Sequence, residues 1–267
     1  MGDARPMLDP MRGPLARALR RVRGPAALPR SPANRAGSAP VDDGDAAIIA
    51  RAAPYTMTGE ARLQALVDAV RYCVARAVPG DFAECGVWRG GSVLAMILTL
   101  QDLGVEDRDI HLFDTFDGMT EPTEHDVSPI DPPARQTWDD ARAGERRPWG
   151  ELFDPELFNE EVVRETLLAT GYPERRLHLV RGPVEETLPR DGPERLALLR
   201  LDTDWYESTR HELVHLYPRL SDGGVLIVDD YGHWAGAKRA VDEYFDEQAE
   251  PLLLHRIDYT GRIAIKH

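Results

Sequence analysis

Four aspartates follow two apolar runs in the second half of the chain. Asp202 and Asp204 come just after the run LALLRL, and Asp229 and Asp230 come directly after GGVLIV. Apolar runs of this length are typical of strands buried on both faces of a parallel sheet. Acids at the carboxyl ends of such strands lie in the crevice where open α/β sheets bind ligands. If the two strands are neighbours, Asp202, Asp229 and Asp230 converge.

These converging acids indicate a metal site. Three carboxylates so close together cannot all stay ionised without a cation between them. Oxygen-only ligation favours a hard divalent ion, magnesium before calcium or manganese. A single Asp after a strand is more often a helix cap or turn former, but three acids on two neighbouring strands favour the metal. We therefore predict Mg²⁺ at Asp202, Asp229 and Asp230, with Asp202 also lining the cofactor site.

A glycine-containing turn forms the second candidate site. The segment DFAECGVWRGGSVLAMILTLQDLG is typical of a strand, a turn and a helix. Gly86, Gly90 and Gly91 let the backbone approach a ligand closely, and the helix entered at Ser92 offers free N–H groups. The spacing differs from the G-x-G-x-x-G pattern of NAD-binding folds. It favours S-adenosylmethionine, whose ammonium Glu84 could face.

Further cofactor-binding residues are expected around this turn. Asp114 ends the strand DIHLFDT, where dinucleotide-binding folds place the acid that binds the ribose hydroxyls. Gly182 closes the strand LHLVRG, and the short helical turn after it is expected beside the adenine. Thr56 and Met57 precede the first long helical pattern and are expected to fold back over the ligand.

The order of the patterns predicts the fold class. Strand and helix patterns alternate from about Pro54 onward, and the chain closes with PLLLHRID and GRIAIKH around a Tyr-Thr-Gly turn. Alternation predicts a doubly wound, Rossmann-like α/β sheet, and the closing hairpin predicts an antiparallel last strand.

Two segments depart from this alternation. Residues 1–50 are rich in Arg, Pro and Ala and poor in large apolar residues, so we predict a disordered arm before a folded domain at 51–267. Residues from about 116 to 154 are rich in Pro and charge without sustained periodicity, which indicates a lid or binding loop inserted into the domain.

Composition excludes several functions. The net charge of −14 argues against a nucleic-acid partner, and the two cysteines, Cys73 and Cys85, are too few for a disulfide framework. Both cysteines are expected in the core. No apolar stretch is long enough to span a membrane and no secretory signal is recognisable, so we expect a cytoplasmic protein that does not bind membranes.

Four sequence blocks together resemble a known enzyme family. DFAECGVWRGGS, FDTFDG, LRLDTDWYEST and VDDYGHW with AVDEYF, within residues 54–267, are similar to the macrocin O-methyltransferase (TylF-type) family of class I S-adenosylmethionine enzymes. The resemblance implies magnesium-dependent methylation of a sugar hydroxyl on an antibiotic. It implies metal ligation by Asp202, Asp229 and Asp230, cofactor binding by residues 84–91 and Asp114, and a base at Asp204.

This chemistry suits the residues present. A sugar hydroxyl is a weak acid, so its methylation needs a Lewis acid and a nearby base. Asp204 points the same way as Asp202 in an extended segment and is the predicted base, with His233 as the rival. We expect a glycosylated small-molecule acceptor and a homo-oligomer.

Other functions fit the sequence less well. A non-sugar hydroxyl or a phenol is an alternative acceptor. A haloacid-dehalogenase-like phosphohydrolase is an alternative of another class, because Asp202-Thr203-Asp204 resembles its Asp-x-Asp motif. That family, however, places the motif on its first strand. A metal-binding sugar-nucleotide transferase would leave the glycine turn unexplained, and a non-catalytic binding protein is the remaining option.

Overall fold

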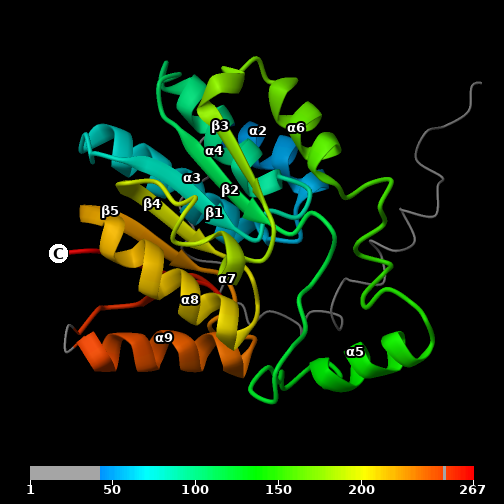
Figure 1. Ribbon diagram of the computed structural model, residues 1–267. Helices are drawn as coiled ribbons and strands as arrows, with labels where there is room; N and C mark the ends of the chain where they lie inside the picture. Colours follow the sequence, from blue (N-terminus) through cyan, green and yellow to red (C-terminus); the bar gives the residue numbers. More distant parts are fainter. Residues whose placement is uncertain (1–42, 249–250) are drawn as a thin grey trace, which may run out of the picture. The chain divides into compact units, whose positions relative to one another are not determined.

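The computed structural model describes residues 43–248 and 251–267. Its strands are β1 (Asp81–Cys85), β2 (Ile110–Asp114), β3 (Leu177–Arg181), β4 (Leu196–Leu201), β5 (Leu220–Val228), β6 (His255–Arg256) and β7 (Arg262–Ile265). They form one sheet in the order β3-β2-β1-β4-β5-β7-β6 (Figure 1). Strands β1 to β5 are parallel, and β7 lies antiparallel between β5 and β6. The predicted α/β fold with an antiparallel last strand is confirmed.

The strand order reverses beside β1. From β1 the chain moves outward through β2 to β3, then returns to pair β4 with the other side of β1. Such a reversal opens a crevice at the carboxyl ends of the two central strands, because the connections leave in opposite directions. The glycine turn follows β1 and Asp202 follows β4, so both predicted sites lie at this crevice.

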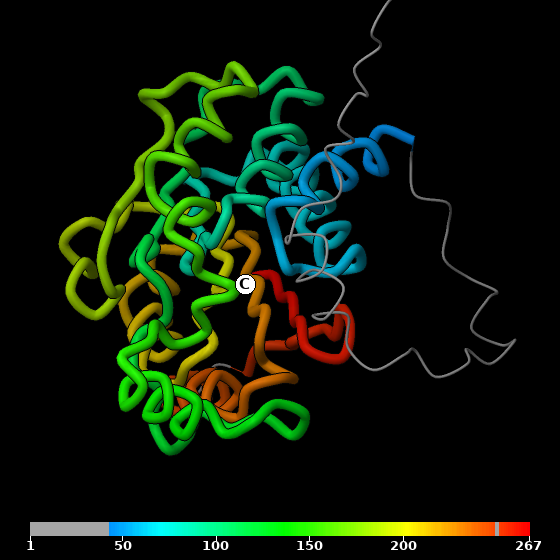
Figure 2. The backbone as a smooth tube through the Cα atoms, turned by 90° about the vertical axis from the view of Figure 1, so that its right-hand side faces the viewer, coloured from blue at the N-terminus to red at the C-terminus, as the bar shows by residue number. Residues whose placement is uncertain are grey.

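Helices cover both faces of the sheet (Figures 1 and 2). The α-helices are α2 (Asp43–Ala52), α3 (Glu60–Ala75), α4 (Gly91–Asp102), α5 (Ala134–Ala143), α6 (Glu160–Leu168), α7 (Val184–Thr187), α8 (Tyr206–Leu216) and α9 (Ala235–Gln248). Three short 3-10 helices are η2 (Ala53–Tyr55), η3 (Glu174–Arg176) and η4 (Tyr217–Arg219). Helices α2, α3, α4 and α6 share a core with one face of the sheet, and α7, α8 and α9 share a core with the other.

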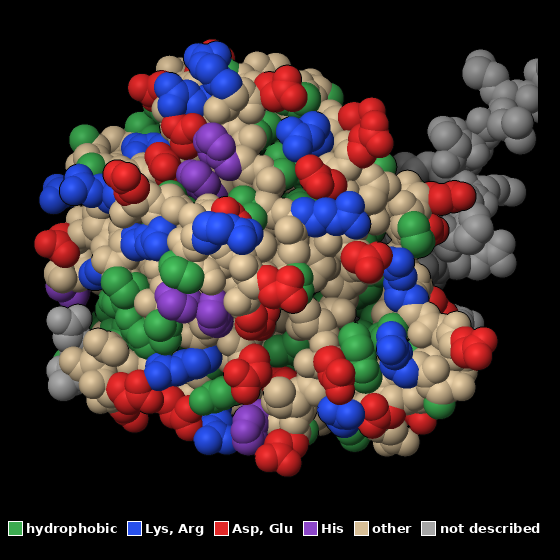
Figure 3. Space-filling model, in the orientation of Figure 1, with side chains coloured by type: hydrophobic (Ala, Val, Ile, Leu, Met, Phe, Trp, Pro, Cys, Tyr) green, Lys and Arg blue, Asp and Glu red, His purple; other side chains and the backbone are tan. Residues whose placement is uncertain are grey.

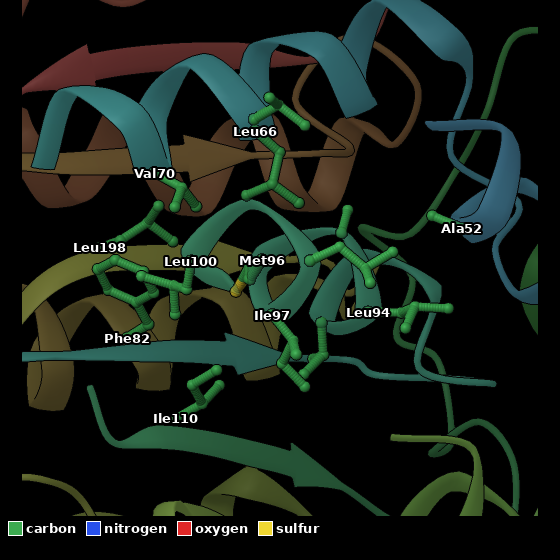
Figure 4. Packing of buried hydrophobic residues seen from close by; sticks show 14 of the residues in the cluster. Ala52, Leu66, Val70, Phe82, Leu94, Met96, Ile97, Leu100, Ile110 and Leu198 are labelled. Atoms are coloured by element: carbon green, nitrogen blue, oxygen red, sulfur yellow. The ribbon is translucent and has the colours of Figure 1, made fainter. Parts of the chain in front are cut away.

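The two cores follow from alternation along the strands. In β1, Phe82 packs in the first core (Figure 4), while Ala83 and Cys85 pack in the second, because successive side chains of a strand point to opposite faces. Helix α4 is buried over its first ten residues, as expected of a helix that is apolar all round. Cys73 and Cys85 are both buried, as predicted.

The folded domain begins earlier than the sequence predicted. Helix α2 occupies residues 43–52, most of which had been assigned to a disordered arm, and it buries Ile48, Ile49 and Ala52. The carboxylate of Asp45 also forms an ion pair with Arg71 of α3, with 2.6 Å between Oδ1 of Asp45 and Nη2 of Arg71. The two isoleucines alone made too weak a periodic pattern to predict this helix. The rest of the predicted arm, residues 1–42, lies outside the described residues.

The segment predicted as a lid contains helix α5 and is attached to the domain at both ends. Near its start, Asp126 is buried and its Oδ1 accepts a hydrogen bond from the backbone N–H of Tyr206 at 2.7 Å. Near its end, the backbone oxygen of Leu152 accepts a hydrogen bond from the indole of Trp88 at 2.9 Å. The segment therefore contacts both α8 and the glycine turn.

The surface is charged and mixed. Figure 3 shows acidic and basic side chains interspersed over the visible face. Within residues 43–248 and 251–267, no helix has the length and apolar character needed to cross a membrane.

The burial of α2 makes a testable prediction about stability. Replacing Ile49 by Ala removes buried apolar atoms between α2 and the core, so the free energy of unfolding should fall by about 2–4 kcal/mol, as measured by urea denaturation. Arg51→Ala, on the exposed side of the same helix, is the matched control and should change stability by less than about 0.5 kcal/mol. Equal effects of the two variants would contradict the packing of α2.

Candidate active site

A buried arginine stands at the centre of the crevice. Arg200 of β4 is 1% exposed, and its guanidinium meets three carboxylates. Nη1 donates to Glu84 and, at 2.7 Å, to Asp202, while Nη2 donates to Asp229 at 2.6 Å. Nη2 also donates to the hydroxyl of Thr58 at 2.8 Å. One cation therefore joins β1, β4, the end of β5 and the segment before α3.

Strand register explains this meeting. Glu84 and Arg200 are direct neighbours on the paired strands β1 and β4, so their side chains share one face. Burial raises the pKa of Glu84 to about 8, although the charge of Arg200 opposes this. Burial alone would lower the pKa of Arg200, but Asp202 and Glu84 more than offset it and raise that pKa.

Three carboxylates gather beside this arginine. Oxygens of Asp202, Asp204 and Asp230 lie within 4.8 Å of one another. Burial, and then the charge of Asp202, raises the pKa of Asp204 to about 7. Burial, and then the charge of Asp204, raises the pKa of Asp230 well above its ordinary value. The Oδ2 atom of Asp230 is buried and receives no hydrogen bond from a donor group.

This cluster fits a divalent cation. Its donors are all carboxylate oxygens, which Mg²⁺ prefers. A cation would stabilise the ionised forms that burial and mutual repulsion disfavour, and would supply a partner to the buried Oδ2 of Asp230. Three residues after the end of β4, the backbone of Asp204 adopts the left-handed region with φ at +69°, so the expectation of an extended segment at Asp204 is wrong. Such strain in a residue other than glycine is characteristic of functional sites.

Asp229, predicted as a third ligand, has a different environment. Its Oδ1 accepts from Arg200 and its Oδ2 from Arg62 of α3. Successive residues of an extended chain point to opposite sides, so Asp229 turns to the arginines while Asp230 turns to the cluster. The structure thus brings together Asp202, Asp204 and Asp230, and leaves Asp229 outside that group.

The glycine turn is held close to the cluster. Gly86 has φ at +83°, and a Cβ there would lie 2.0 Å from the backbone oxygen of Asp202, so only glycine fits. The carboxylate of Asp114 accepts hydrogen bonds from the backbone N–H groups of Val87, Trp88 and Phe116 at 2.7 to 2.9 Å. The predicted ribose-binding acid therefore also organises the turn.

The remaining predicted cofactor residues surround this turn. Gly90, with φ at +82°, precedes α4, and Ser92 is buried in its first turn. A Cβ on Gly91 would lie 2.6 Å from Cβ of Thr56, so the 55–58 segment does fold back onto the turn, with Met57 half exposed. The N–H of Gly182 donates to the backbone oxygen of Asp114, which places the end of β3 beside the end of β2.

The chain also matches known proteins. Residues 41–265 match the family described as macrocin-O-methyltransferase (TylF). The chain belongs to this family. It is therefore an O-methyltransferase, and the phosphohydrolase alternative is wrong. The position of Asp202 after β4 agrees, since the phosphohydrolase motif would follow the first strand.

Three similar proteins illustrate the match. Demethyldecarbamoylnovobiocin O-methyltransferase of Streptomyces niveus is 34% identical over 206 residues, covering 76% of this chain and 73% of that protein. The 8-demethyl-8-(2,3-dimethoxy-alpha-L-rhamnosyl)-tetracenomycin-C 4'-O-methyltransferase of Streptomyces olivaceus is 36% identical over 222 residues. The match covers 82% of this chain and 79% of that protein. The solved structure of the O-methyltransferase NovP aligns with a TM-score of 0.67 and 32% identity, covering 79% of this chain and 82% of NovP.

The rival base of this methyltransferase, His233, is engaged on both ring nitrogens. Nε2 lies 2.6 Å from the carboxylate of Asp131, in the segment predicted as a lid, and Nδ1 lies 3.0 Å from the hydroxyl of Tyr259. The side chain is 16% exposed. His233 thus links the insertion to the turn before β7.

Sequence reasoning missed three residues of the site. Arg200 is the lone charge in the otherwise apolar run LALLRL, and a lone charge in a buried strand indicates an opposite charge beside it. Arg62 lies in the first turn of α3 and Thr58 just before it, where they looked like ordinary helix-start residues. Their roles depend on contacts distant in sequence, which no local pattern records.

The contacts of Arg200 with the three carboxylates lead to a second prediction. Arg200→Met removes the cation shared by Glu84, Asp202 and Asp229 and leaves their charges buried, so the free energy of unfolding should fall by about 3–5 kcal/mol. Urea denaturation measures this. Arg195→Met, exposed just before the same strand, is the control and should stay within about 0.5 kcal/mol of wild type. Wild-type stability in Arg200→Met would show that the acids do not depend on this guanidinium.

Proposed function

We propose that this O-methyltransferase moves a methyl group from S-adenosylmethionine to a sugar hydroxyl of a glycosylated natural product, with a divalent cation bound. The observation that carries the proposal is the carboxylate cluster of Asp202, Asp204 and Asp230 beside the glycine turn. The glycine turn would bind the cofactor, and the carboxylate cluster would bind the cation and deprotonate an alcohol.

The residues around the turn suit S-adenosylmethionine. Gly86, Gly90, Gly91 and Ser92 present backbone close to the crevice, and the proposed site is completed by Glu84, Asp114, Gly182, Thr56, Met57 and Asp202. Acids near the turn suit the ammonium of the cofactor. Held between turn and cluster, the acceptor oxygen would be positioned for in-line attack on the methyl carbon, which accounts for much of the acceleration in such reactions.

Asp202 and Asp230 are proposed to hold the cation, with magnesium first. Mg²⁺ is usually bound through one or two carboxylates, with water and substrate completing its shell. The bound ion would act as a Lewis acid that lowers the pKa of the acceptor hydroxyl. The predicted ligand Asp229 is left out of this set, because both of its oxygens face arginines.

Asp204 is proposed as the general base. It lies within the cluster, next to both proposed ligands, and it accepts the proton of the acceptor hydroxyl as the oxygen attacks. His233 serves instead to hold Asp131 and Tyr259.

The acceptor is assigned by analogy with the relatives. One relative's name specifies the 4'-hydroxyl of a rhamnosyl group on a tetracenomycin, and the other a demethyldecarbamoylnovobiocin. The segment from residue 116 to 154 is proposed to cover such an acceptor. Its contacts with α8 and with Trp88 of the turn place it beside both proposed sites.

Binding of the cofactor product tests the proposal first. Calorimetry should show that the wild-type protein binds S-adenosylhomocysteine, and the ligand should raise the melting temperature. A nucleotide sugar or inorganic phosphate should do neither. Lack of S-adenosylhomocysteine binding at millimolar concentration would contradict the assignment of the glycine turn.

Four single variants test the acids. Asp230→Asn should weaken Mg²⁺ binding by at least roughly tenfold, whereas Asp229→Asn should leave it within about threefold, since its partners are arginines. Asp204→Asn should lower turnover by about 100-fold or more and keep Mg²⁺ affinity near wild type. Turnover is measured with a glycosylated acceptor and Mg²⁺ affinity by calorimetry. Asp222→Asn, at an exposed position of β5, is the control.

The results separate the alternatives for each acid. Loss of Mg²⁺ binding in Asp229→Asn would restore the ligand set predicted from sequence. Loss of Mg²⁺ binding in Asp204→Asn would make Asp204 a ligand. Full turnover in Asp204→Asn would move the search for a base to His233, and full turnover after exhaustive chelation would remove the cation from the proposal.

A further inference from the structure

Arg89 lies in the glycine turn and has no acidic partner among the described residues. Its guanidinium carbon lies 5.7 Å from the ring centre of Tyr55 and 5.5 Å from that of Trp88. Its Nε is buried and has no hydrogen-bond partner. Aromatic rings offset only part of the cost of withdrawing a cation from water, so this group is suited to receive an anion.

The other arginines of the crevice are already neutralised. Arg200 meets Glu84, Asp202 and Asp229. Arg62 meets Asp229 and, at 3.2 Å, Asp258. Within the described part of the crevice, Arg89 is thus the arginine whose charge is not matched by a carboxylate.

The rings that hold Arg89 are themselves fixed. Trp88 has φ at +48°, its N–H donates to Asp114 at 2.9 Å, and its indole donates to the backbone oxygen of Leu152. The backbone of Tyr55 lies against α4, where a Cβ on Gly91 would lie 2.6 Å from the carbonyl carbon of Tyr55. Rings anchored in this way hold the guanidinium in place before any ligand arrives, which lowers the ordering cost of binding.

We propose that Arg89 binds the carboxylate of the methionine part of the cofactor. This inference rests on the proposed function, since it concerns the same ligand. The ammonium of that ligand suits the acids of the crevice, but its carboxylate would be repelled by them and needs a cation. An arginine fork matches a carboxylate with two parallel hydrogen bonds, and Arg89 is the cation that the turn offers.

A pair of ligands tests this contact without measuring activity. S-adenosylhomocysteine carries the carboxylate, and its decarboxylated analogue keeps the adenosine, the sulfur and the ammonium. Calorimetry on the full chain should show that Arg89→Met, which keeps an apolar stem, weakens S-adenosylhomocysteine roughly 10- to 100-fold. The same variant should weaken the analogue by less than about threefold, because the analogue has no carboxylate to lose.

Two further variants complete the test. Arg89→Lys keeps the positive charge but loses the planar guanidinium, so its preference for S-adenosylhomocysteine over the decarboxylated analogue should lie between those of wild type and Arg89→Met. If Arg89→Met fails to fold, Arg89→Lys tests the carboxylate contact in its place. Arg175→Met, an exposed arginine of η3, is the matched control and should bind both ligands as wild type does.

The outcomes are distinguishable. If Arg89 variants weaken both ligands equally, or neither, while wild type binds S-adenosylhomocysteine, the carboxylate contact is wrong and the cofactor assignment stands. If wild type binds neither ligand, the cofactor assignment fails and this inference fails with it.

Discussion

The contact on which the crevice depends is the meeting of Arg200 with Glu84, Asp202 and Asp229 inside the sheet. Buried ion pairs are weak evidence of net stability, because desolvation of the charges opposes their attraction. Their effect here is geometric. A register shift between β1 and β4 would separate Glu84 from Arg200 and leave the carboxylate of Glu84 buried without its cationic partner. The guanidinium therefore makes other registers of the strands less stable, and so fixes the positions of the glycine turn and the acid cluster that follow these strands.

Neutralisation by arginine also divides the acids into two groups. Glu84 and Asp229 accept hydrogen bonds from arginine, although burial still raises the pKa of Glu84 to about 8, whereas Asp204 and Asp230 are buried beside other acids, and burial and these acids raise their pKa values. Asp202 touches both groups, since it accepts from Arg200 and also lies in the cluster. Arginine thus holds the strand ends of the site together, and the remaining acids are those proposed to bind the cation and to act as the base.

The sequence predicted the fold because the fold's signals are local. Apolar runs, the glycine turn and the closing hairpin each lie within a few residues, and they were enough for the sheet and for the meeting of Asp202 with Asp230. Metal ligation by Asp229 stays a prediction; in the structure its oxygens accept from Arg200 and Arg62, and the alternation of successive side chains turns it away from Asp230. The partners of Arg200 depend on register, and α2 depends on burial against α4, so neither left a readable pattern.

The 116–154 insertion, which is proposed to cover the acceptor, is attached to the domain at two places. It is attached near residue 126 to the start of α8, which follows Asp202 and Asp204, and near residue 152 to Trp88 of the glycine turn. A substitution at either attachment would disturb the frame, because Trp88 also donates to Asp114. Between the attachments, the backbone oxygen of Val127 accepts from the N–H of Ala235, Ala134 and Trp149 pack with Trp205 next to the acid cluster, and Asp131 contacts His233. Acceptor preference is therefore expected to be encoded by the exposed residues between 127 and 151, whose substitution leaves these contacts intact.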